Sequence, residues 1–77
     1  MQPQNTGILD SLDPTLIDSG RAALPPAEEG SPERVAVQVS SLLIGRVWIT
    51  YRLTRGSLHG NPIWLWQPIY AELGADR

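Results

Sequence analysis

Residues 46–55 read RVWITYRLTR, and this stretch decides the fold. Every second residue is apolar, and the residues between are mostly cationic or polar. Because successive side chains of a strand point to opposite faces, the alternation predicts a strand with one buried face and one exposed face. The predicted core face consists of Val47, Ile49, Tyr51 and Leu53. The predicted exposed face consists of Arg46, Trp48, Thr50, Arg52 and Thr54.

The residues after this strand predict a hairpin. Residues 56–62 (GSLHGNP) have the composition of a turn or longer loop, and Ile63–Trp66 reads as the returning strand. Proline has no N–H for a ladder, so Pro68 is expected to end this strand near Gln67. The segment from Pro68 to Leu73 is expected to form a short terminal helical turn that stops at Gly74.

The residues before the strand fit two structures. Three valines at alternate positions, from Val35 to Val39, favour another strand. A helix that starts at Pro32 and ends at Gly45 is also compatible, since it would gather a stripe that includes Leu42 and Leu43. The predicted fold class is therefore α+β or mostly β, with two or three antiparallel strands in residues 34–77.

Residues 1–33 are expected to form a flexible, acidic arm ahead of that compact module. Residues 1–31 contain four prolines and three glycines and no aromatic residue. Such a segment buries too little apolar surface to offset its ordering entropy. The two parts also differ in charge: residues 1–33 hold six acidic residues and one arginine, net −5, whereas residues 34–77 hold five arginines and two acidic residues, net +3. This asymmetry indicates either that the arm folds over the module or that each part meets its own partner.

One segment of the arm predicts a short amphipathic helix. Asp13 is a suitable N-cap, Pro14 suits the first helical position, and Gly20 is expected to lie just past the end. Apolar residues then share one face. We interpret them as a docking element made of Leu9, Leu12, Leu16 and Ile17.

Composition argues against catalysis and against metal or cofactor binding. The chain has no cysteine and a single histidine, His59, in a glycine-rich loop, so it lacks the donors of a zinc site. It also has no glycine-rich nucleotide motif. We therefore expect a nonenzymatic protein without a cofactor. The lack of cysteines and of a basic, apolar leader favours a cytoplasmic location, and the polar residues within the apolar stretch from Val35 to Ile49 argue against a membrane span.

The remaining signal is an aromatic and cationic surface. Tryptophan and arginine dominate interface hot spots, and a module this small has little core of its own. The sequence therefore predicts a noncatalytic protein-protein interaction module, an accessory subunit, adaptor or inhibitor, which binds a protein partner or forms a homo-oligomer. The alternative is a small module that binds single-stranded nucleic acid and is inhibited by its own acidic arm. The candidate binding residues are Trp48, Trp64, Trp66, Arg46, Arg52 and Arg55.

Overall fold

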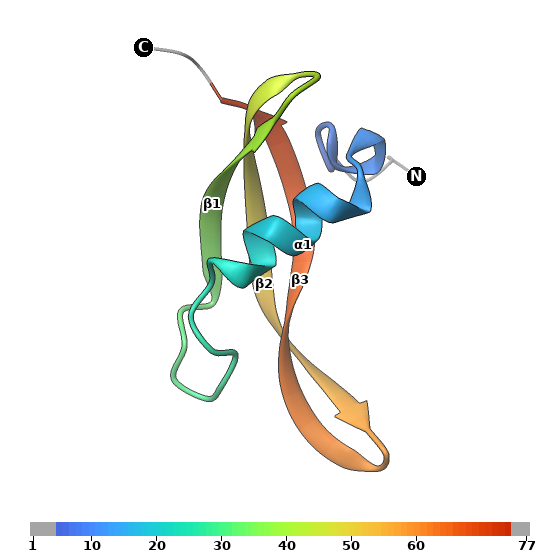
Figure 1. The fold of residues 1–77 in the computed structure, drawn as a ribbon. Helices are drawn as coiled ribbons and strands as arrows, with labels where there is room; N and C mark the ends of the chain where they lie inside the picture. Colours follow the sequence, from blue (N-terminus) through green and yellow to red (C-terminus); the bar gives the residue numbers. More distant parts are fainter. Residues whose placement is uncertain (1–4, 75–77) are drawn as a thin grey trace.

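A computed structural model describes residues 5–74 of the chain, and residues 1–4 of the arm and 75–77 of the module lie outside the description. A short 3-10 helix, η1 (Leu9–Ser11), precedes helix α1 (Pro14–Ala22). Three strands follow: β1 (Arg34–Ser41), β2 (Gly45–Leu58) and β3 (Asn61–Leu73). They form an antiparallel sheet in the order β1-β2-β3, and α1 crosses one face of it (Figure 1). We call the face under α1 the helix face and the other the open face.

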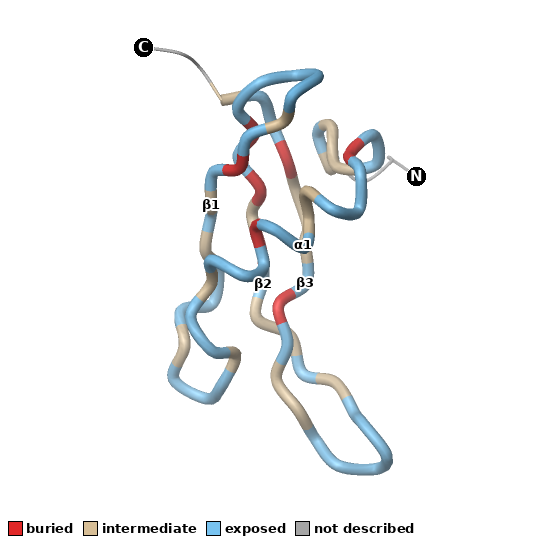
Figure 2. Tube along the Cα trace, viewed as in Figure 1, coloured by how far each residue is buried: buried red, intermediate tan, exposed pale blue. Residues whose placement is uncertain are grey.

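The prediction for β2 is confirmed. The side chains of Val47, Ile49 and Tyr51 are fully buried, and Leu53 packs against them half-buried. The undecided segment before it is a strand, because Val35, Val37 and Val39 stand opposite Tyr51, Ile49 and Val47. Cross-strand apolar pairs on one face outweigh the helical stripe. Figure 2 shows the buried residues along the middle of the sheet under α1.

The turn between β2 and β3 is shorter than the loop expected over residues 56–62. The strands stay paired up to Leu58 and Asn61, so only His59 and Gly60 connect them. Both have positive φ, 52° and 80°, which is the backbone of the tight hairpin turns whose twist matches the strands. A histidine tolerates this conformation less well than glycine, so sequence rules did not single out a two-residue turn here.

The expected terminal helical turn at 68–73 is wrong, because β3 continues to Leu73. Backbone groups of alternate residues in an antiparallel strand point to opposite sides. On β3 those of Ala71, opposite Ile49, point away from β2 and bond to the arm: its N–H donates to Thr6 O (3.1 Å) and its C=O accepts from Ile8 N (2.9 Å). Pro68, opposite Tyr51, has the same orientation, so its missing N–H removes no bond to β2. A bulge at Ile69 lets the strand continue past it.

Helix α1 starts as predicted but ends later. Asp13 is its N-cap and accepts a bond from the backbone N–H of Thr15 (3.0 Å), with Pro14 at the first position. Gly20, the expected stop, is instead buried within the helix. A Cβ at this position would lie 2.5 Å from the Tyr51 hydroxyl oxygen. Glycine is therefore the residue that lets α1 approach the sheet.

The described part of the arm shares its core with the sheet. Leu12 is 8% exposed, and Leu9, Leu16 and Ile17 pack against the buried cluster. Two polar bonds add to this contact: the Tyr51 hydroxyl donates to Ile17 O (2.5 Å) and Trp66 Nε1 donates to Pro25 O (2.8 Å). The mobility expected of residues 1–33 in solution stays a prediction.

We predict that Gly20→Ala lowers stability. In an ordinary helix the change raises helix propensity by about 1 kcal/mol, but here overpacking against Tyr51 should cost about 1 to 3 kcal/mol. Urea unfolding followed by tryptophan fluorescence measures the difference. Ser19→Ala, an exposed site on the same helix, is the matched control and should be neutral or slightly stabilising. Tyr51→Phe should relieve part of the Gly20→Ala defect, and a Gly20→Ala protein more stable than wild type would contradict this packing.

We further predict that Ile49→Ala costs about 2 to 5 kcal/mol of unfolding free energy, because it leaves a cavity in the centre of the core. Thr50→Ala, on the open face of the same strand, should cost well under half of that. Equilibrium urea unfolding of both variants tests the assignment of faces. Equal losses for the two substitutions would show that β2 is not one-sided.

Candidate interaction surface

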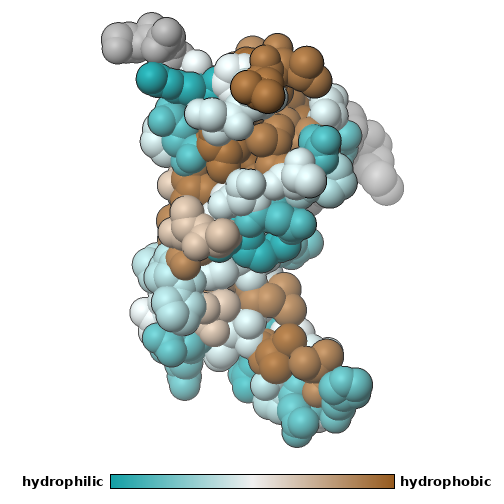
Figure 3. Space-filling view, viewed as in Figure 1, coloured by the Kyte–Doolittle hydropathy of each residue, from teal (hydrophilic) through white to brown (hydrophobic). Residues whose placement is uncertain are grey.

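The turn between β1 and β2 exposes three consecutive large apolar side chains. Leu42 and Leu43 are fully exposed and Ile44 is 46% exposed. We call these three residues the apolar turn. Leu73, 58% exposed and opposite Val47, lies at the same end of the sheet. Figure 3 shows apolar side chains gathered at this end of the molecule.

The apolar turn has a defined backbone. The Ser41 hydroxyl oxygen accepts from the backbone N–H groups of Leu43 (3.2 Å) and Ile44 (3.4 Å), and Gly45 closes the turn with a φ of 84°. The left-handed conformation suits glycine, and a serine that caps the following amides is common in turns. Neighbouring polar groups thus hold the turn in shape while its side chains point outward.

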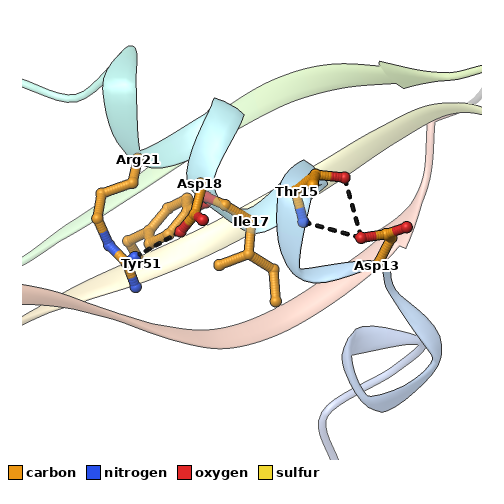
Figure 4. Close-up of polar contacts among 6 residues, drawn as sticks. All are labelled: Asp13, Thr15, Ile17, Asp18, Arg21 and Tyr51. Carbon is orange, nitrogen blue, oxygen red and sulfur yellow. Dashed lines mark hydrogen bonds and ion pairs between the residues drawn. The ribbon is translucent and has the colours of Figure 1, made fainter.

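A hollow of about 400 Å³ separates the apolar turn from the start of α1. Its apolar lining consists of Leu12, just before α1, Leu16 of α1, and Leu43 and Ile44 of the apolar turn, together with Ser41 and Asp13. The Asp13 carboxylate accepts from the Thr15 backbone N–H and hydroxyl (Figure 4), and these bonds lower the pKa of Asp13. The hollow is therefore an apolar groove with an anionic group at its rim.

The open face has a different character. Arg46, Trp48 and Arg52 alternate with the buried residues of β2 and lie on this face, and Trp48 is 39% exposed. Arg34 stands directly opposite Arg52, and within residues 5–74 neither has an ion-pair partner. Like charges directly opposite each other on a sheet repel, so this pair is a candidate anion contact.

The six binding residues predicted from the sequence do not form one surface. Three are on the open face, as described above. Arg55 and Trp64 pair on the helix face, with the guanidinium carbon 5.2 Å from the ring centroid, a cation–π contact. Trp66 is 5% exposed and belongs to the chain's own core. The predicted docking residues Leu9, Leu12, Leu16 and Ile17 also face the chain's own sheet.

The sequence prediction missed the apolar turn. It placed Leu42 and Leu43 in the stripe of the alternative helix, where they would have been core residues. The signal available was Ser41 before the three apolar residues and Gly45 after them, since serine and glycine mark turns.

Other kinds of site find little support among the described residues. Residues 5–74 hold no group of three or more His, Cys, Asp or Glu side chains that could bind a metal ion. His59 is exposed at the tip of the β2–β3 hairpin. No helix in the described part of the chain is long and apolar enough to cross a membrane.

Comparison with known proteins gives no relative: no family model, no curated protein sequence and no solved structure matches this chain. Function must therefore be argued from the chain itself.

The buried hydroxyl of Tyr51 makes the folding stability depend on pH. Burial raises the pKa of Tyr51 above its ordinary value of 10.0, with smaller opposing effects from Arg21. Its hydroxyl lies beneath α1 and donates to Ile17 O, close to the Arg21–Asp18 ion pair (Figure 4).

We predict that stability falls as the pH rises above about 10, because the unfolded chain then loses the Tyr51 proton while the folded chain still holds it. Below that pH both states are neutral at Tyr51, and this residue adds no pH dependence. Tyr51→Phe should flatten the alkaline fall, and Tyr70→Phe should leave it in place. Urea midpoints measured from pH 8 to pH 11 test this, and an unchanged slope in Tyr51→Phe would refute it.

Proposed function

We propose that this chain is a noncatalytic protein-interaction module that binds a protein partner through the apolar turn. The observation that carries the proposal is the exposure of three consecutive large apolar side chains. Single exposed leucines are common on protein surfaces, but a contiguous run is uncommon unless it serves binding.

The fold supports such a role energetically. Full burial of each of the three side chains would contribute about 1.5 to 3 kcal/mol. Since Ser41 and Gly45 already define the backbone of the turn, binding costs little ordering of the chain. The adjoining groove beside α1 offers a receptor for an apolar side chain of the partner. The partner surface that fits is a shallow apolar pocket with a donor or cation that meets Asp13.

The experiment uses a photoreactive amino acid at position 43 of the full chain, irradiated in extract of the source cells. We expect one predominant protein adduct at position 43 and none with the same group at Gln67 on the open face. Unlabelled wild type should compete with the adduct, and Leu42→Ser/Leu43→Ser should not. The double variant should unfold within about 0.5 kcal/mol of wild type, because its side chains contact little within the chain.

Two results would refute this proposal. One is competition by the double variant as strong as that of wild type. The other is a large loss of stability in the double variant, since the turn would then be structural.

A second candidate function, binding of single-stranded nucleic acid, is favoured by the Arg34–Arg52 pair beside Thr50 and Tyr70. Helix α1, which carries Asp18, covers the opposite face of the sheet from these arginines, whereas Asn5 of the arm lines the same hollow as Arg34 and Arg52. Inhibition of this site by the acidic arm stays a prediction. Fluorescence anisotropy with a labelled oligonucleotide distinguishes the two functions. Nucleic-acid binding predicts that the affinity for the oligonucleotide falls by about 0.7 log units per log unit of salt for each phosphate contact. It also predicts that Arg52→Gln weakens this affinity.

A further inference from the structure

The two edge strands of the sheet differ in whether their outward backbone groups are blocked, and this difference points to a second binding surface. β1 and β3 each have one side without a neighbouring strand of the sheet. An edge strand offers free N–H and C=O groups to any other strand, and proteins usually block such edges. The backbone groups that face each edge follow from the hydrogen bonds already described.

The outer edge of β3 is blocked in three ways. The outward groups of Ala71 are bonded to Thr6 and Ile8 of the arm. Alternate residues of β2 direct their backbone groups to the same side, so Ile49, Tyr51 and Ser57 all face away from β3. Pro68 stands opposite Tyr51, and Pro62 stands opposite Ser57. The nitrogens of both prolines therefore face outward and have no hydrogen to donate. The bulge at Ile69 further interrupts this edge.

The outer edge of β1 has none of these features. Leu53 N–H donates to Glu33 O (2.8 Å), so these opposed residues form a hydrogen-bonded pair. By alternation, the backbone groups of every second residue from Arg34 onward point away from β2. These residues are Arg34, Ala36, Gln38 and Ser40. Within residues 5–74, no hydrogen bond joins their outward backbone groups to another segment. The strand contains no proline, lysine or bulge.

The side chains of β1 also favour a neighbour. Val35 and Val37 lie on the helix face but are only half-buried, because β1 is the last strand on that side. The open-face residues that follow Arg34 are small or uncharged. Arg34, at one end, is the only charged residue of the strand. An added strand would cover the valines and meet no unfavourable charge.

We propose that β1 pairs antiparallel with β1 of a second copy, about a two-fold axis at Val37, to form a six-stranded sheet. In this register Arg34 stands opposite Ser40 and Ala36 opposite Gln38. All four outward-facing residues of each copy are then paired, and four hydrogen-bonded pairs of two bonds each give eight bonds. An axis at Gln38 would leave Arg34 unpaired and give three such pairs.

The axis at Val37 also suits the side chains. Val37 of one copy meets Val37 of the other, and Val35 meets Val39, so apolar residues pair across the interface on the helix face. The two Arg34 side chains lie at opposite ends. A second copy therefore offers this edge a matching set of backbone groups and side chains, as expected of an isologous interface. This inference does not depend on the proposed function of the apolar turn.

A single cysteine tests the register directly, because the chain has none of its own. With the axis at Val37, the two Cα atoms at position 37 form a non-hydrogen-bonded pair about 4.5 Å apart, within reach of a disulfide. Val37→Cys should give a covalent dimer under mild oxidation. The matched control is Val35→Cys, whose two copies would be offset by four residues, about 14 Å, and should not cross-link. Equal cross-linking of the two variants would refute the register.

Charge variants test the association itself in the full chain. By light scattering after size exclusion, wild type should have twice the 8.5 kDa chain mass at high concentration. Ala36→Glu/Gln38→Glu and Ala36→Lys/Gln38→Lys should each be folded by circular dichroism but monomeric, since like charges oppose across the axis. An equimolar mixture of the two should restore the dimer mass. Leu42→Ser/Leu43→Ser should remain dimeric, which separates this surface from the apolar turn.

Three results would overturn the proposal. They are a monomeric wild type up to millimolar concentration, a dimer that survives in the glutamate and lysine variants, and a mixture that stays monomeric.

Discussion

The close contact of α1 with Tyr51 is the constraint on which the rest of the structure depends. Tyr51 lies at the centre of the sheet, and its hydroxyl reaches a helix carbonyl only because Gly20 has no side chain in the way. This contact holds α1 against β1 and β2, and with it Leu12 and Leu16 at one end of the helix face. The apolar face of a sheet must be buried against another element. The helix supplies the second layer, and its position leaves the apolar turn outside that core.

The alternating pattern of residues 46–55 was enough to predict strand β2 and its buried face, and residues 56–66 predicted its hairpin partner; the order of the strands was not predicted. Side chains of a strand alternate between its two faces whatever the rest of the fold does, so this pattern can be seen in the sequence alone. The cap of α1 was also predictable, since Asp13 and Pro14 act through their immediate neighbours. The end of α1 was not, because the role of Gly20 depends on Tyr51, 31 positions further along the chain. Pro68 misled in the same way: the orientation of its nitrogen depends on which β2 residue it faces.

The candidate surfaces were harder to predict than the fold. Trp64 and Trp66 share one face of β3, as alternation requires. Their surroundings depend on the pairing register of β3 with β2 and on the position of the arm. Trp66 is covered by the arm near Pro25, and Trp64 stacks with Arg55. The run from Leu42 to Ile44 has the same composition as a buried strand. Periodicity cannot distinguish a short buried run from an exposed one. Only the pairing of Ser41 with Gly45 places it on a turn.

The two proposed surfaces are compatible because they occupy different parts of β1. Pairing about Val37 uses the outer edge of the strand, whereas the apolar turn follows its last residue, Ser41. An antiparallel pair would place the two turns at opposite ends of the six-stranded sheet. The proposed dimer would have two identical apolar turns, and a partner with repeated sites could engage both. The second contact would then be intramolecular, and its effective concentration would raise the overall affinity beyond that of one turn. In the proposed dimer, a small chain with a modest contact surface would gain binding strength by pairing an edge that its own sheet leaves open.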